Sequence, residues 1–303
     1  MKRGGQTAIC IAYGRMGNQL FLASFLDSIL SDGDRVLSLG MGEFMEGFEW
    51  TAIDARDSSD PKVRKRFKRP IFLLGRLAGR LRLVDIIRQK LRPFETANGS
   101  FNMYDDEYSW TKGLLSRFVF LDRCYFQTPQ GRTPRFRLKE RHLKKARAFL
   151  ERLPDKPTAF IHMRRGDYRN FSQFGQSPLL PVDYFKRGAE DIAAKFPDVQ
   201  FILLSDTIEE AKNALSAENL HVFAGDNPYE DFGMMTLCDG GVMSNSTFSW
   251  WGGYFCRRRL PLVAPRGWMA PGLGFTYPPN IIADWMTPID PVSDPVIGGG
   301  DNS

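Results

Sequence analysis

The sequence contains no apolar run that approaches the roughly 20 residues of a membrane-spanning helix. Residues 1–5 lead directly into a strand-like run and not into the apolar core of a signal peptide, so we expect neither export nor a spanning anchor. Four scattered cysteines exclude a disulfide scaffold, and three histidines make a His-rich metal site an unpromising interpretation. A cytoplasmic location is therefore the expectation.

A recognisable phosphate-binding loop is also missing near the amino end. Residues 14–19 (Gly-Arg-Met-Gly-Asn-Gln) lack the glycines and the lysine that GxGxxG and GxxxxGK[ST] require. They lie between a predicted strand and a predicted helix, so Gly17 and Asn18 could approach a ligand closely. A tight turn between strand and helix explains the same glycines equally well.

The sequence does have the composition of a globular protein, with 43% hydrophobic and 25% charged residues in a chain of 303. This length favours about two domains. We expect an α/β lobe at residues 1–153, a second lobe at residues 154–289 and a disordered tail at residues 290–303. In the first lobe we expect strands at 7–12 and 36–39, and helices at 19–30 and 137–153; the segment 43–133 permits no detailed topology.

Beyond residue 154 the alternation becomes regular. Strands are predicted at 158–162, 199–204, 221–223, 241–243 and 261–264, and helices at 182–196, 208–216, 229–237 and 248–256. This pattern is typical of a parallel, doubly wound sheet, which binds ligands beyond the carboxyl ends of its strands. Polar clusters follow four of the strands, at residues 162–168, 205–207, 225–227 and 244–249, and we expect them to form one site.

Positive charge, net +6 over the chain, is concentrated between Lys62 and Arg92. This segment has twelve basic residues against one acid, Asp85, interleaved with leucines and isoleucines. It reads as a basic amphipathic helix or helix pair. A solvated face, an anionic membrane surface and nucleic acid are the competing interpretations, and no nucleic-acid-binding module supports the last.

The cluster at 162–168 (His-Met-Arg-Arg-Gly-Asp-Tyr) offers two guanidinium groups beside a glycine and an acid. A guanidinium is permanently charged and presents a planar fork of donors, which suits a pyrophosphate. Arg164 and Arg165 are therefore candidate anion ligands, with Asp167 orienting one of them. The alternative is a plain surface ion pair.

The segment 244–253 (Ser-Asn-Ser-Thr-Phe-Ser-Trp-Trp-Gly-Gly) begins where a strand ends and a helix starts, a position that favours anions. Its hydroxyls, its amide and its first aromatic ring could bind phosphates and a base; in the alternative they form only a helix cap and a core. The candidates are Ser244, Asn245, Ser246, Thr247 and Phe248. We expect Trp250 and Trp251 to belong to the core.

One acid-x-acid pattern, Asp32-Gly33-Asp34, resembles the metal-binding motif of a large class of glycosyltransferases. It precedes a predicted strand where that motif would follow one. A turn between helix and strand accounts for these residues.

Together the motifs at 14–19, 162–168, 204–206 and 244–253 resemble the α-1,2-fucosyltransferase family of galactoside fucosyltransferases (glycosyltransferase family 11). The resemblance implies a GT-B-like pair of Rossmann-like α/β lobes, with the donor site in the carboxyl-terminal lobe facing the cleft and the acceptor on the other. It also implies GDP-β-L-fucose as donor, inversion at the anomeric carbon, and no required metal or other cofactor.

Carried onto this chain, the resemblance implies that Arg164 neutralises the donor pyrophosphate, supported by Arg165 and Asp167. Asp206 would lie near the guanosine, while Ser246, Thr247 and Phe248 would hold phosphates and base. Asn18 would reach the β-phosphate or fucose from its loop. His162 is a candidate general base or, alternatively, a structural brace for the arginine loop.

The leading hypothesis is transfer of L-fucose to the 2-hydroxyl of a β-galactoside in surface glycan synthesis. A galactose-containing glycan is then the acceptor, no nucleic acid is bound, and residues 62–92 are candidates for peripheral contact with an anionic membrane. The alternatives are another donor sugar or acceptor on the same fold, and a non-catalytic glycan-binding relative.

Overall fold

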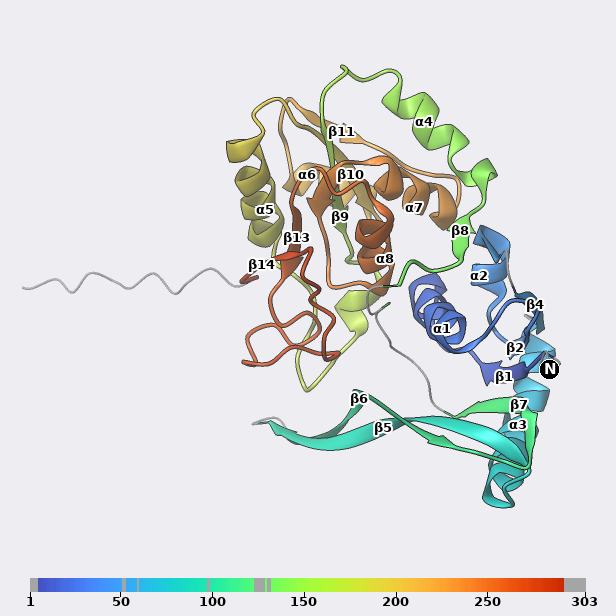
Figure 1. Ribbon diagram of the computed structural model, residues 1–303. Coiled ribbons are helices and arrows are strands. Elements are labelled where there is room, and N and C mark those ends of the chain that lie inside the picture. Colours follow the sequence, from blue (N-terminus) through green and yellow to red (C-terminus); the bar gives the residue numbers. More distant parts are fainter. Residues whose placement is uncertain are drawn as a thin grey trace, which may run out of the picture. The chain divides into compact units, whose positions relative to one another are not determined.

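The computed structural model describes residues 5–50, 53–58, 60–96, 99–122, 129 and 132–291. The chain divides into two compact units, the first comprising Met1–Glu95 and Ser100–His142 and the second Thr96–Gly99 and Leu143–Ser303. Each unit is an α/β structure around a six-stranded sheet (Figure 1). The predicted α/β class with two Rossmann-like parts is confirmed. Residues 143–153, which we expected in the first lobe, group with the second unit.

The sheet of the second unit is parallel throughout and follows the strand order β11-β10-β9-β12-β13-β14. Its strands are β9 (Thr158–Met163), β10 (Gln200–Ser205), β11 (Leu220–Val222), β12 (Gly240–Val242), β13 (Leu262–Pro265) and β14 (Thr287–Ile289). The helices are α4 (Lys144–Leu150), α5 (Val182–Lys195), α6 (Ile208–Ala214), α7 (Pro228–Leu237) and α8 (Thr247–Phe255), with a short 3₁₀ helix η2 (Asp167–Asn170). Each expected strand and helix of this unit is present within two residues of its predicted ends.

Every side chain of β9 is buried, because helices cover both faces of this sheet. Alternate residues of the strand face opposite sides. Ala159, Ile161 and Met163 join a core with α5 and α6, whereas His162 faces α8, where its ring meets Phe248. Trp250 and Trp251 of α8 are fully buried, as expected.

The first strand of this unit, β9, lies between the second, β10, and the fourth, β12, so the strand order reverses beside β9. Open α/β sheets bind ligands at such a switch point.

The first unit has the sheet order β4-β2-β1-β7-β5-β6. Its strands are β1 (Thr7–Ile11), β2 (Arg35–Leu39), β4 (Asp54–Ser58), β5 (Val84–Thr96), β6 (Gly99–Thr111) and β7 (Leu115–Asp122), and a separate pair joins β3 (Phe48–Trp50) to β8 (Phe136–Leu138). The helices are α1 (Met16–Ile29), α2 (Gly42–Gly47) and α3 (Pro61–Arg80), with the 3₁₀ helix η1 (Glu140–His142). Among the described residues, no helix is long and apolar enough to cross a membrane.

Three expectations for the chain before residue 154 need correction. The helix expected at 19–30 begins at Met16, so Gly17 and Asn18 lie in its first turn and not in a loop. The segment 62–92 is helical only to Arg80; a left-handed residue, Arg82 (φ 53°), then leads into strand β5. The helix expected at 137–153 is replaced by β8, η1 and the short α4, because residues 136–138 pair with the distant strand β3. Most of the expected tail, residues 292–303, lies outside the described residues.

Candidate functional site

Three of the four polar clusters meet at the carboxyl end of the second unit's sheet. They follow β9, β10 and β12, the strands around the switch point. Contacts join them directly: Arg164 reaches Asp206 after β10, and His162 reaches Ser244 after β12. The strand order therefore brings together residues that are 42 and 82 positions apart in sequence.

Arg164 pairs with two carboxylates of this group. Its side chain is 26% exposed and forms a two-pronged pair with Asp167, with Nε–Oδ1 at 3.0 Å and Nη2–Oδ2 at 2.9 Å. Its Nη1 lies 3.2 Å from Oδ2 of Asp206. Burial lowers the pKa of Arg164, but the hydrogen bond to Asp167 and the charge of Asp206 outweigh it, and the net shift is upward. The positive charge is thus permanent and fixed in direction.

Asp206 organises the backbone of the arginine loop. Its Oδ1 accepts the amide of Arg165 at 2.9 Å, and its Oδ2 accepts the amide of Gly166 at 3.1 Å. A Cβ on Gly166 would come within 2.7 Å of this carboxylate, so the close approach requires a glycine. Both carboxylate oxygens are engaged within the protein, so the loop is held from the neighbouring strand.

Arg165 has a structural environment, unlike its neighbour. Its Nε donates to Glu210 of α6 at 2.7 Å, and its Nη1 donates to the carbonyl of Leu180 at 3.2 Å. Arg169 pairs with the same glutamate. On the other side, the Tyr168 hydroxyl donates to the carbonyl of Asn245 at 3.0 Å. The loop is therefore tied to both neighbouring segments.

The segment after β12 begins helix α8 with a neutral cap. Ser246 is the N-cap, and its hydroxyl accepts the amide of Phe248 at 3.2 Å. Asn245 is buried and donates to the carbonyls of Pro178 and Trp268, which fixes the turn. Thr247 and Phe248 are half-buried. Because no acidic residue occupies the first turn of α8, its positive end is available to an anion.

His162 is buried behind Arg164. Its Nδ1 lies 2.9 Å from the Ser244 hydroxyl, and its ring packs 5.3 Å from that of Phe248. Burial and the charge of Arg164 lower its pKa to about 4, although the nearby Asp206 carboxylate acts in the opposite direction. The imidazole is therefore neutral at physiological pH. A buried side chain with these partners suits the brace interpretation better than that of a general base.

The amino-terminal motif lies in the first unit, where it is held by Glu43. The carboxylate of Glu43 accepts the amide of Met16 at 2.7 Å and pairs with Nε of Arg15 at 2.6 Å. Gln19 is buried and accepts the amide of Phe44, while Asn18 lies against Gly14. The start of α1 is thus capped by a protein carboxylate.

The fourth polar cluster, at residues 225–227, has a capping function. Asn227 is the N-cap of α7 and accepts the amides of Tyr229 and Glu230, while Asp226 pairs with Lys145. The expectation that all four clusters form one site stays a prediction for this cluster. It follows β11, the edge strand, and its side chains cap a helix.

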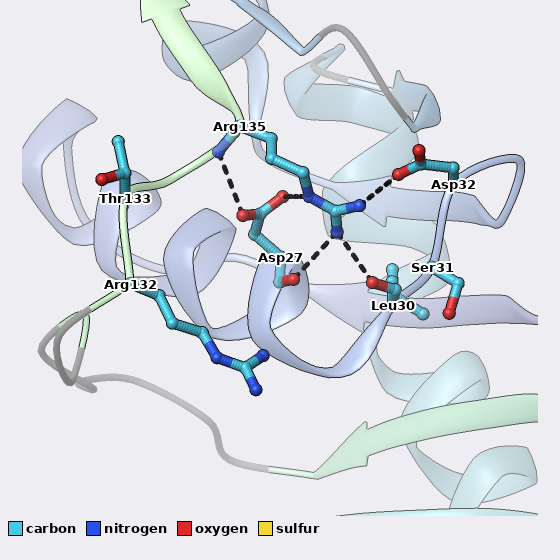
Figure 2. Close-up of a pocket in the computed structure, with 7 residues that line it drawn as sticks. All are labelled: Asp27, Leu30, Ser31, Asp32, Arg132, Thr133 and Arg135. Carbon is cyan, nitrogen blue, oxygen red and sulfur yellow. Dashed lines mark hydrogen bonds and ion pairs between the residues drawn. The ribbon is translucent and has the colours of Figure 1, made fainter.

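A hollow of about 530 Å³ in the first unit is lined in part by Asp32, the first acid of the acid-x-acid pattern (Figure 2). Arg135 extends into it and pairs with Asp27 and Asp32, and its guanidinium also donates to the carbonyl of Leu30. Asp34 accepts the amides of Gln6 and Ser31. The pattern is the structural turn that we expected. Within the described part of the chain, no group of three His, Cys, Asp or Glu side chains is arranged to hold a metal.

Several supporting residues escaped the sequence interpretation. Glu210, Glu43 and Tyr168 hold the two turns through contacts that are 27 to 77 positions apart in sequence. The available signal for Glu210 was its place in the first turn of the helix that follows Asp206, and for Tyr168 its place in the motif itself.

Comparison with known proteins identifies the family. The model of glycosyl transferase family 11 matches residues 101–271, more than half of the chain. The O-antigen biosynthesis glycosyltransferase WbnK of Escherichia coli is 29% identical over 121 residues, 37% of this chain and 39% of that protein. Galactoside alpha-(1,2)-fucosyltransferase 1 of Ateles belzebuth is 30% identical over 116 residues, 36% of this chain and 32% of that protein.

The chain thus spans 39% and 32% of the length of these two relatives. Among solved structures, the fucosyltransferase NodZ from Bradyrhizobium aligns over 84% of this chain and 94% of its own, with a TM-score of 0.46 and 11% identity. The match to the family model includes β9, β10 and β12 and the three clusters that follow them. The chain belongs to glycosyl transferase family 11.

Proposed function

We propose that this protein transfers L-fucose from GDP-β-L-fucose to the 2-hydroxyl of a β-galactoside, with inversion and without a required metal. The observation that carries the proposal is Arg164, fixed at the switch point of the second sheet across from the start of α8, whose cap is the neutral Ser246. This is the place where a doubly wound sheet binds a nucleotide, and the charge there suits a diphosphate. The names and family of the relatives support fucose as the transferred sugar.

Arg164 is assigned the main electrostatic role. Cleavage of the glycosyl-phosphate bond leaves negative charge on GDP, and a fixed guanidinium stabilises that charge more in the transition state than in the ground state. Asp167 is 63% exposed and pairs with the face of Arg164 that offers two donors. We infer that the pyrophosphate replaces Asp167 on that face, while Asp206 continues to hold the loop.

The other predicted residues receive supporting roles. Asp206 is assigned to loop positioning in place of the guanosine contact that the resemblance implied, because both its oxygens are engaged. Ser246 and Thr247 would present hydroxyls and backbone amides to the phosphates, with Phe248 beside the base. Arg165, Ser244 and Asn245 would support the turns, and His162 would brace Arg164.

The acceptor side of the proposal involves the first unit. Gly17 and Asn18 lie in the first turn of α1. We retain Asn18 as a candidate contact to the β-phosphate or fucose. The acceptor we propose is a galactose-containing surface glycan or its lipid-linked precursor, handled in the cytoplasm or at the inner face of the membrane. WbnK is named for O-antigen biosynthesis, which favours such an acceptor.

The test is a transfer assay with GDP-fucose and lactose, with and without a chelator, followed by linkage analysis of the product. We expect α-1,2-linked fucose and equal rates with the chelator. Turnover that the chelator abolishes would contradict metal independence. A product from another nucleotide sugar would identify a different donor, and GDP binding without transfer to any galactoside would favour a non-catalytic glycan-binding protein.

A further inference from the structure

Helix α3 is attached to the first unit through the side of the helix that carries its glycines. Gly75 and Gly79 lie against Phe120 of β7 and Ile86 of β5, and a Cβ on Gly75 would come within 2.6 Å of the Phe120 ring. Phe72 packs edge-on against the same ring, with centroids 6.0 Å apart. Phe72, Gly75 and Gly79 follow the spacing i, i+3, i+7, so one side of α3 faces the sheet.

An ion pair reinforces this orientation. Arg76 donates to the fully buried Asp122 of β7 through Nε at 3.0 Å and Nη2 at 2.9 Å. Burial alone would raise the pKa of Asp122, but Arg76 and Arg88 hold it below its usual value. A carboxylate without exposure needs its cationic partners, so α3 cannot rotate about its axis without losing this pair.

The leucines of α3 therefore point away from the sheet. Leu74 and Leu77 of α3, with Leu81 at its C-cap, repeat the spacing i, i+3, i+7 two positions after the sheet-facing set, which is about 200° further around the helix. They are 64%, 53% and 61% exposed. An amphipathic helix of a globular protein normally buries its apolar side. Here that side is left outside, with Phe67 also exposed on the helix.

The exposed apolar surface continues beyond the helix. The amides of Leu114 and Leu115 donate to the carbonyls of Arg82 and Leu83, at 2.7 Å and 2.8 Å, so these two segments run side by side. Leu114 is 83% exposed and Leu115 is 52% exposed. We call the group of Leu74, Leu77, Leu81, Leu83, Leu114 and Leu115 the leucine surface. Exposed apolar side chains on neighbouring segments of a protein exterior are typical of interaction sites.

The charge along the segment 62–92 is almost entirely of one sign. Of the thirteen charged residues between Lys62 and Arg92, only Asp85 is acidic, and Asp85 is fully buried and paired with Lys112. Arg69, Arg80 and Arg82 are exposed beside the leucines, and Lys65 and Arg66 are exposed near the start of the helix. An apolar stripe flanked by lysine and arginine is complementary to a bilayer with anionic headgroups.

We propose that the leucine surface docks on a membrane. Its side chains, from α3 and from residues 81–83 and 114–115, would insert among the acyl chains, and the exposed lysines and arginines of α3 would lie at anionic headgroups. This contact is with the bilayer itself and does not depend on the proposed transfer reaction. The proposal specifies the orientation of α3: the side with the glycines packs against the sheet, and the side with the leucines contacts the lipid. A helix that lies in the plane of the interface in this way need not span it.

The test is sedimentation of the full chain with vesicles in the absence of donor and acceptor. We expect the protein to pellet with vesicles containing phosphatidylglycerol, to bind phosphatidylcholine vesicles at least about tenfold more weakly, and to be released by 1 M salt. The triple variant Leu74→Ser, Leu77→Ser, Leu81→Ser should lose at least about tenfold in partitioning, because its apolar side chains no longer enter the bilayer.

Charge is tested separately with a matched control. Lys65→Gln, Arg66→Gln, Arg69→Gln should also weaken binding at least about tenfold, whereas Lys186→Gln, Lys195→Gln, Lys212→Gln removes three exposed charges of the second unit and should leave binding unchanged. Wild-type protein that stays in the supernatant with anionic vesicles, or serine and glutamine variants that bind like wild type, would overturn the proposal.

A gain of signal distinguishes insertion from nonspecific adsorption. Leu77→Trp should shift its fluorescence emission to the blue on anionic vesicles, and Leu37→Trp, at an exposed sheet position of the same unit, should not. A wild-type dimer that the serine variant converts to monomer, together with no blue shift at position 77, would identify a second copy as the occupant and would contradict membrane docking.

Discussion

The first strands of the two units end in turns that occupy equivalent places in their sheets but carry different electrostatics. β1 lies between β2 and β7, and β9 lies between β10 and β12. After β1, Glu43 provides a carboxylate that caps the start of α1, and Arg15 extends outward with 75% of its side chain exposed. After β9, Arg164 is held at 26% exposure, and α8 across the switch point is capped only by the neutral Ser246.

This difference explains why the second unit is the better candidate for a donor diphosphate. In the first unit the protein itself supplies the anion at the helix start, so an incoming phosphate would have to displace Glu43. In the second unit the helix start is uncharged, and the most exposed anion nearby is Asp167, which pairs with Arg164 at the surface. We therefore expect an anion site only where no protein carboxylate already occupies the helix start.

The largest expected effect is at the two arginines. Arg164→Ala should lower kcat/KM for GDP-fucose by about 10²–10³, the usual loss when one electrostatic contact to a transition state is removed. Arg15→Ala, the matched change in the first unit, should alter kcat/KM less than about threefold, since its ion pair is exposed. Comparable losses in both variants, measured at unchanged thermal stability, would remove the distinction between the turns.

The next effect separates the two carboxylates around Arg164. Asp206→Asn should reduce kcat/KM at least about tenfold, because two loop amides and one guanidinium nitrogen lose a charged acceptor. Asp167→Asn should cost less than about threefold, because this carboxylate is largely exposed and is the one that we propose the donor replaces. Steady-state kinetics on both variants would contradict the assignment if Asp167 proved the more important residue.

The smallest of the three effects concerns His162 and pH. Its pKa is about 4 in the folded protein against an ordinary 6.5, so as pH falls the unfolded chain binds the proton first. The stabilisation is complete above pH 6.5 and is lost as pH falls toward 4, amounting to about 2 kcal/mol between pH 7.5 and pH 5. His162→Gln should lack this component.

Denaturant unfolding at pH 7.5 and at pH 5 measures this pH-dependent part of the free energy of unfolding. The wild-type protein should lose more stability on acidification than the His162→Gln variant. An equal loss in the two proteins would mean that His162 is not buried in its neutral form.

The second unit was predictable in detail because its signals are local. The predicted strands are short apolar runs, α5 is amphipathic, and Arg164 directly follows the run at 158–163, so a candidate anion site could be placed from one segment. The parallel order then brought Ser244 and Asp206 to that segment. What could not be predicted was the use of Asp206, since its bonds to the amides of Arg165 and Gly166 span 41 and 40 positions.

The first unit was less predictable because its structure depends on distant partners. The start of α1 at Met16 is set by Glu43, 27 residues away, so Asn18 was expected in a loop. The basic segment has helical periodicity up to Arg80, but the strand β5 that follows exists through pairing with β7. Helix α3 could be recognised as amphipathic from the sequence. The side that faces the sheet is set by two close contacts, Gly75 with Phe120 and Gly79 with Ile86, which the sequence did not reveal.

The most direct measurement is calorimetric titration of GDP into the wild-type protein, Arg164→Ala and Glu43→Gln. We predict one GDP per wild-type chain, affinity at least about tenfold weaker for Arg164→Ala, and unchanged affinity for Glu43→Gln, since a charged bidentate contact is lost only in the first variant. Wild-type affinity in Arg164→Ala would contradict the assignment of the donor diphosphate to the second unit's switch point.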